Sequence, residues 1–126
     1  MSEQETIFGQ VVGKSNNYQA VPDKQNGGRR IIKNVEIRRY ERLFASQCRI
    51  YRNKLISCKF RLNITVFHSS TRFDLDNSLK TVLDCLQQVG AITNDNLCIA
   101  ITAEKRIDRM NPRVVFSIDE IEQRCF

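Results

Sequence analysis

Three aspartates and one lysine in the second half of the chain have the chemistry of a metal site. Asp74 and Asp76 stand two residues apart at the expected start of a helix, and Lys80 follows Asp76 by one helical turn. Asp95 stands beyond the end of that helix, between two asparagines. Carboxylate oxygens are the ligands that Mg²⁺ and Mn²⁺ prefer, and clustered carboxylates repel one another unless protons or cations intervene. These residue types indicate a divalent-cation site.

Such a site suits phosphodiester hydrolysis. A hard cation that bridges carboxylates and a phosphate lowers the pKa of bound water and neutralises the charge that develops on the phosphate. An ammonium group such as that of Lys80 orients the water or stabilises the same charge. The alternative is structural: Asp74 and Asp76 cap a helix, while Asp76, Lys80 and Asp84 form ordinary i,i+4 surface pairs. Spacing alone leaves both interpretations open.

Hydrophobic periodicity predicts the elements that would position these residues. Strict apolar–polar alternation from Ile56 to Val66 indicates a strand with one buried side. Apolar residues at three- and four-residue steps predict one helix from Asn34 to about residue 53 and another over about 76–89, which Gly90 ends. Further strands are expected at 6–13, 29–33, 97–105 and 113–118, with a loop over 14–28. The order predicts a single α+β domain over residues 1–126, with a mixed sheet of about four to five strands and two main helices.

Chain lengths permit Asp95 to approach the other two aspartates. A helix over 76–89 advances about 20 Å at 1.5 Å per residue. The extended residues 90–95 would cover about 20 Å in return. A chain that doubles back along its own helix would therefore bring Asp95 near Asp74 and Asp76.

The charge distribution indicates a polyanionic partner. The chain has 126 residues and a net charge of +6; residues 1–54 hold 11 basic and 5 acidic side chains, whereas residues 55–126 hold 9 of each. Cationic surface gains affinity for nucleic acid by releasing counterions from phosphates. The alternative is a basic protein kept soluble by its charge.

Composition excludes several classes of protein. Hydrophobic residues at 41% and charged residues at 27% are near the globular average, which excludes wholesale disorder. No apolar run approaches the ~20 residues of a membrane span, and residues 1–20 lack a signal-peptide core, so a cytoplasmic protein without membrane contact is expected. Five cysteines without a CxxC pair are expected to be reduced thiols rather than disulfides or zinc ligands. The single histidine, His68, is expected to be exposed or to make one hydrogen bond.

The acidic region contains the run Asp74-Leu75-Asp76-Asn77-x-x-Lys80-x-x-x-Asp84-x-Leu86, followed by Gly90 and Asp95. It resembles the RusA family of Holliday junction resolvases, and Ser15-Asn16-Asn17-Tyr18 is similar to the Ser-Asn-Asn motif after that family's first strand. The resemblance spans about residues 7 to 118. It departs from the family at Asn94, which replaces the first member of an acidic pair. Asp95 keeps the family's distance from Asp74, so the site is expected to survive this change, and the effect on metal preference or rate stays open.

The resemblance implies a homodimeric endodeoxyribonuclease that resolves four-way DNA junctions in recombination and repair. Mg²⁺ is the implied cofactor, with Mn²⁺ as a substitute, and the implied source is a bacterium or a prophage. Asp74, Asp76 and Asp95 would be the catalytic metal ligands and Lys80 the catalytic lysine. Two alternatives remain: a non-catalytic branched-DNA-binding domain with the same fold, and a metal nuclease of broader flap or fork specificity.

Expected DNA contacts lie mainly in the basic half. Tyr18 has a ring that stacks on an unpaired base or packs against the first strand, and the two asparagines before it bond phosphate or hold the loop. The full set of residues expected to bind DNA is Lys14, Asn16, Asn17, Tyr18, Arg29, Arg30, Lys33 and Arg72.

Overall fold

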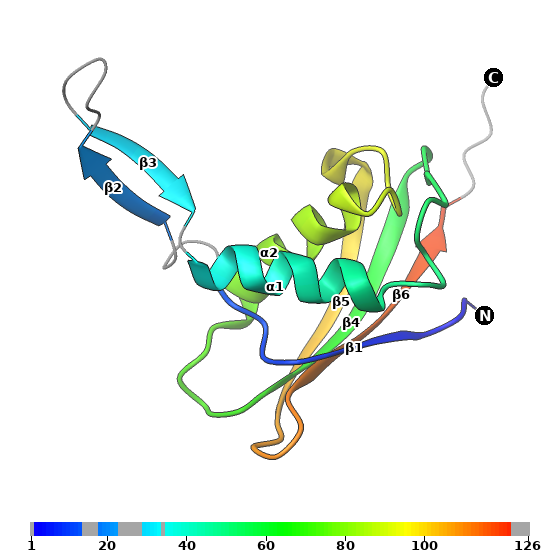
Figure 1. Ribbon diagram of the computed structural model, residues 1–126. Coiled ribbons are helices and arrows are strands. Elements are labelled where there is room, and N and C mark those ends of the chain that lie inside the picture. The colour runs from blue at the N-terminus through cyan, green and yellow to red at the C-terminus, as the bar shows by residue number, and fades with distance from the viewer. Residues whose placement is uncertain (1, 14–17, 23–28, 34, 122–126) are drawn as a thin grey trace.

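The computed structural model describes residues 2–13, 18–22, 29–33 and 35–121 and confirms an α+β fold (Figure 1). Four strands form a mixed sheet in the order β1-β6-β4-β5, and β2 and β3 form a separate hairpin. The elements are β1 (Glu5–Phe8), β2 (Tyr18–Pro22), β3 (Arg29–Lys33), α1 (Val35–Gln47), β4 (Phe60–His68), α2 (Leu75–Gln88), the short 3-10 helix η2 (Asp95–Leu97), β5 (Cys98–Ile107) and β6 (Arg113–Glu120). None of the helices in the described part of the chain has the length and apolar character that a membrane span requires.

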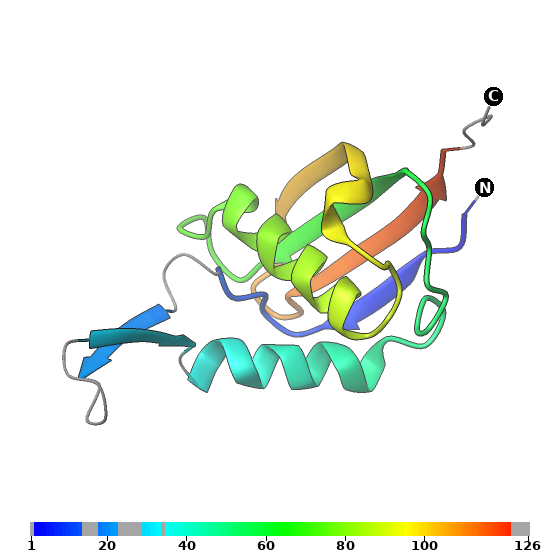
Figure 2. The ribbon, with the colours of Figure 1, turned by 90° about the horizontal axis from the view of Figure 1, so that it is seen from above.

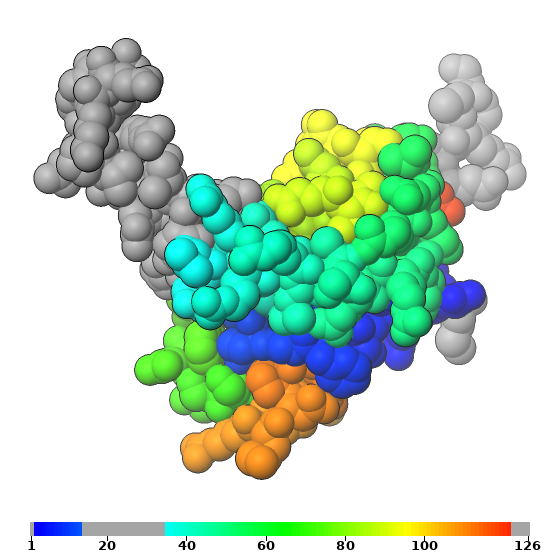
Figure 3. All heavy atoms as spheres, in the orientation of Figure 1, coloured from blue at the N-terminus to red at the C-terminus, as the bar shows by residue number. Residues whose placement is uncertain are grey.

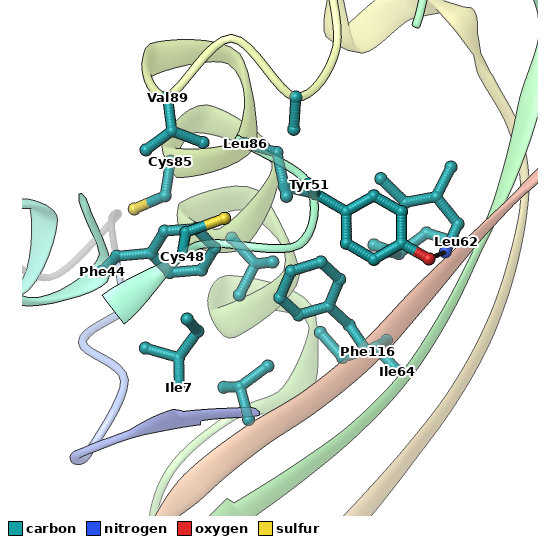
Figure 4. Packing of buried hydrophobic residues seen from close by; sticks show 14 of the residues in the cluster. Ile7, Phe44, Cys48, Tyr51, Leu62, Ile64, Cys85, Leu86, Val89 and Phe116 are labelled. Carbon is teal, nitrogen blue, oxygen red and sulfur yellow. Dashed lines mark hydrogen bonds between the residues drawn. The ribbon is translucent and has the colours of Figure 1, made fainter. Parts of the chain in front are cut away.

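Both long helices cover one face of the sheet (Figure 2). The expected alternation of β4 is confirmed, because Phe60, Leu62, Ile64 and Val66 are buried on the helix side while the residues between them are not. These side chains share one cluster with the buried stripe of α2 and with Phe44 of α1, which stacks on Phe116 of β6 at 5.9 Å between ring centroids (Figure 4). The sheet and the two helices therefore share one hydrophobic core.

The direction of β4 and β5 decides where α2 begins and ends. β5 pairs with β4 in parallel, whereas β6 pairs with β4 and with β1 in the antiparallel sense. Two parallel neighbours need a crossover connection, and α2 supplies it. Consequently α2 starts at the carboxyl end of β4, and the chain after α2 leads to the amino end of β5. These two points lie at opposite ends of the parallel strands.

The first helix ends earlier than its periodicity predicts. α1 stops at Gln47, although buried Cys48 and Tyr51 continue the three- and four-residue spacing. The carboxylate of Glu5, on β1, accepts hydrogen bonds from the backbone N–H groups of Arg49, Ile50 and Tyr51 at 2.9–3.1 Å. These bonds replace helical ones, so the chain turns into a loop that buries the same apolar residues.

The strand boundaries also differ from expectation in the first half of the chain. The first strand ends at Phe8 rather than at residue 13, because Gly9 has a φ of +117° and the chain turns there toward α2. Residues 18–22, expected in a loop, form β2 and pair with β3, which is confirmed at 29–33. Only the pairing partner reveals β2, since its sequence contains Pro22 and no clear alternation.

Glu5 is expected to contribute measurably to stability. Burial by itself raises the pKa of Glu5, but the three backbone N–H groups and the Cys48 thiol outweigh burial and hold this pKa below its ordinary value. Glu5→Gln should therefore lower the free energy of unfolding at pH 7 by about 1–3 kcal/mol.

Because the pKa is lowered in the folded state, this stabilisation is complete above the unfolded-state pKa of about 4.3 and is lost as the pH falls through the folded-state value. Urea unfolding at pH 7 and below pH 4 measures both, with the exposed neighbour Glu3→Gln as control. An equal effect of Glu5→Gln at both pH values would contradict the account.

Candidate active site

Asp74 occupies the N-cap position of α2 but does not act as a cap. Its backbone is extended, with φ −91° and ψ 135°, and its side chain makes no capping hydrogen bond. The carboxylate instead accepts a long hydrogen bond, 3.4 Å, from the side-chain amide of Asn77. The positive end of the α2 dipole favours negative charge here. Because the exposed Asp74 carboxylate makes no capping hydrogen bond with the backbone amides of α2, its oxygens are available to another ligand.

Asn77, which donates to the Asp74 carboxylate, was not among the site residues predicted from the sequence. Its side chain lies against Gly13, where an added Cβ would come within 3.1 Å of the Asn77 Cβ, so the chain after β1 passes close to the start of α2. A pocket of about 130 Å³ opens beside Asp74 and is lined by Val12, Gly13, Arg72, Phe73, Asp74, Asn77 and Ser78. The spacing of three residues from Asp74 was the available signal, since such residues neighbour each other on a helix.

Asp76 and Lys80 lie on the outward face of α2. Both side chains are exposed, and no ion pair joins them within the described residues, so the surface-pair interpretation has no support at this position. Positions 76, 80, 83 and 87 follow one another at steps of four, three and four and therefore share a face. This face carries Asp76 at its amino end, Lys80 and Leu83 in the middle, and Gln87 at its carboxyl end.

Asp95 lies at the far end of α2. Its backbone N–H donates to the Gln87 side chain at 2.9 Å, and it opens η2 immediately before β5. Gln87 follows Asp76 by three helical turns, about 16 Å along the axis. Chain length permits residues 90–95 to return toward Asp74, but this return does not occur. The parallel β4–α2–β5 crossover leaves Asp95 at the amino end of β5, whereas Asp74 follows the carboxyl end of β4.

A single copy therefore does not gather the three aspartates. Within residues 2–13, 18–22, 29–33 and 35–121, no three His, Cys, Asp or Glu side chains come together to hold a metal ion. The cysteines among these residues are free thiols, as expected: Cys48 and Cys85 are buried, and Cys58 and Cys98 are partly buried. The structure places the aspartates of the motif in two groups, one at each end of α2, and each group is called a half-site below.

His68 differs from expectation. It is fully buried at the end of β4, contacts Gln10 and Ser78, and stacks on Phe73 with 5.3 Å between ring centroids. Burial lowers the pKa of His68, nearby Lys105 lowers it further, and Asp74 opposes them weakly. The imidazole therefore lies buried beneath the start of α2, where its lowered pKa favours the neutral form.

Most of the residues expected to bind DNA belong to the β2–β3 hairpin or to the chain before it. Lys14, Asn16 and Asn17 lie outside the described residues. Tyr18 begins β2, where it pairs with Lys33 of β3, and Arg29 and Arg30 begin β3. Arg72 is exposed immediately before the acidic motif, and its guanidinium lies over the Phe73 ring at 5.4 Å from the centroid.

Residues 35–54, which include α1, carry an excess of positive charge. Residues 35–54 hold six basic and two acidic side chains. Arg38, Arg42 and Arg49 are exposed without an ion pair to any described carboxylate, and α1 lies along the surface in Figure 3. On β5 and β6 the arginines are paired instead, Arg106 with Glu104 at 3.0 Å and Arg113 with Asp108 at 2.9 Å. The exposed arginines of α1 are thus suited to contact phosphates.

A comparison against known families identifies the family of the chain. The model of the endodeoxyribonuclease RusA family matches residues 9–119, and the chain belongs to this family. No curated protein matches the chain. The protein is accordingly an endodeoxyribonuclease, a hydrolase that acts on DNA, of a family that resolves Holliday junctions.

Proposed function

We propose that the protein is a Mg²⁺-dependent homodimer that resolves four-way DNA junctions in recombination and repair, with Asp74, Asp76 and Asp95 as metal ligands and Lys80 as the catalytic lysine. The observation that carries the proposal is the division of the acidic motif between the two ends of one exposed helical face. Family membership supports the reaction, and the half-sites support the need for a second copy.

The outer face of α2 and the neighbouring edge of the sheet form the surface on which we place that second copy. Leu79 and Leu83 of α2 are only partly buried. Ile101 of β5 points to the same side of the sheet as the helices because it pairs with Leu62, and 42% of its surface is exposed. β5 is also an edge strand with ten residues, and long unprotected edges are uncommon in monomers. An apolar strip along an open edge suits a symmetric interface.

A two-fold axis perpendicular to α2 and near its middle would complete the site. Such an axis sets two α2 helices antiparallel, so that the amino end of one lies beside the carboxyl end of the other. Asp74 and Asp76 of one copy then face Asp95 of the other, and the same contact is repeated at the second site. Two sites related by a two-fold axis match a substrate that must be cut on two opposed strands.

The donor set fits a hard divalent cation. Asp76 and Asp95 have exposed carboxylates, and Asp74 offers oxygens that no backbone amide occupies. When bound, Mg²⁺ supplies an acidic water and neutralises charge on the phosphate. Lys80, one turn after Asp76 on the same face, orients the attacking water or stabilises the developing negative charge. Arg72 and the basic side chains of β3 and α1 hold the DNA backbone without reading sequence.

Cleavage of synthetic DNA tests the proposal directly. With Mg²⁺ or Mn²⁺, the protein should introduce paired nicks across a four-way junction and leave a linear duplex of the same sequence uncut. Comparison with flaps and forks separates a resolvase from a nuclease of broader specificity. Equal cleavage of all branched substrates would replace the junction-specific function by the broader one, and full activity in excess EDTA would refute metal dependence.

A further inference from the structure

We propose that His68 is a positioning residue that holds Asp74 in place through Ser78, and so sets the geometry of the half-site at the start of α2. The inference rests on the proposed function of Asp74 as a metal ligand. It assigns a role to a buried group that the acidic motif does not include.

The hydrogen bonds around His68 have one consistent direction. The Ser69 backbone N–H donates to Oε1 of Gln10 at 2.7 Å, which leaves the Gln10 amide nitrogen facing Nδ1 of His68 at 2.8 Å. Nδ1 is therefore an acceptor, and a neutral ring carries its proton on Nε2. Nε2 lies 3.3 Å from Oγ of Ser78, whose own hydroxyl donates to the Asp74 carbonyl at 2.9 Å. The chain of donors runs from Gln10 through His68 and Ser78 to Asp74.

The same histidine anchors the connection between β4 and α2. Phe73 stacks on His68 at an interplanar angle of 9°, and Arg72 covers Phe73. Lys105 of β5 donates to the carbonyl of Thr71 at 2.9 Å. Residues 69–74 are thus fixed from below by the imidazole and from the side by β5, and Asp74 is the last residue of this connection.

This arrangement does more than fill space. A buried apolar side chain in place of His68 would pack against Phe73 equally well, but it would leave the Gln10 amide and the Ser78 hydroxyl without this partner. Ser78 also contributes its backbone N–H to the Asp74 carbonyl, so its position decides how α2 begins. Groups behind metal ligands orient them, and their loss typically costs 10- to 100-fold in metal affinity or activity.

Matched variants test the role. His68→Leu removes both ring nitrogens and keeps a buried apolar side chain, whereas His68→Gln keeps a polar donor in reach of Ser78. Ser78→Ala removes the relay hydroxyl, and Ser78→Thr retains it. Ile118→Ala, a core truncation at the opposite end of β6, controls for lost stability alone. The measured quantities are the Mn²⁺ concentration that gives half of the Mn²⁺-induced rise in Tm, the kcat for junction cleavage, and the Kd for junction DNA without metal.

We expect His68→Leu and Ser78→Ala to raise the half-saturating Mn²⁺ concentration about 10-fold and to lower kcat by a similar factor, with Kd for DNA unchanged. His68→Gln and Ser78→Thr should recover most of the loss, and Ile118→Ala should lower Tm only. Unchanged metal dependence in both His68→Leu and Ser78→Ala would mean that His68 only packs in the core and does not position Asp74. If the wild type itself neither binds Mn²⁺ nor cleaves DNA, the proposed function fails first, so the two failures are distinguishable.

Discussion

Replacing Asp76 by Asn is expected to lower the rate of junction cleavage by on the order of 10²–10³-fold, the loss that follows removal of one group that stabilises transition-state charge. The substitution keeps the shape of the side chain and removes its charge, so metal affinity falls while the fold is retained. Affinity for junction DNA should stay the same or rise slightly, since one negative charge near the phosphates is gone. Single-turnover cleavage and a gel-shift titration measure the two effects.

Asp84→Asn is the matched control for this prediction. Asp84 lies two helical turns beyond Asp76 on the same helix and is only partly exposed. Its substitution removes the same charge from α2 at a residue that the proposal assigns to neither half-site, so the cleavage rate should change little. Equal loss in both variants would mean that the net charge of α2, rather than a ligand at Asp76, controls cleavage.

A mixture of Asp76→Asn and Asp95→Asn proteins is expected to recover activity that neither protein has alone. In a mixed dimer with sites shared between copies, one site carries both substitutions and the other carries none. The intact site should cut one strand, so the product is a nicked junction. At equal amounts and random exchange about half of the dimers are mixed, which predicts roughly a quarter of the wild-type number of intact sites.

This experiment distinguishes shared from unshared sites. If Asp76 and Asp95 act within one copy, every site in a mixed dimer carries one substitution and no activity returns. A mixture of Asp76→Asn with Asp74→Asn is the control, because these two residues belong to the same half-site and each site of the mixed dimer is damaged. Recovery in both mixtures, or in neither, would contradict the assembly proposed for α2.

Local patterns predicted the elements that carry the site. Alternation in β4, the apolar stripe of α2 and Gly90 after it are set by the period of each element, and these predictions are confirmed. Gly90 has a φ of +75°, the conformation for which glycine is used after a helix. The predicted helix α1 was too long because the Glu5 carboxylate on β1 accepts hydrogen bonds from the backbone N–H groups after Gln47. Hydrophobic periodicity does not reveal a partner more than 40 residues away in the sequence.

The sequence by itself determined which side chains are available: an acidic motif at the start of α2, a lysine one turn later, Asp95 before β5 and a basic first half. Only the tertiary structure decided that these acids form two half-sites instead of one cluster. The physical reason is strand direction. Once β5 pairs in parallel with β4, α2 must cross the length of the sheet, and its two ends are held apart by a rigid helix about 20 Å long.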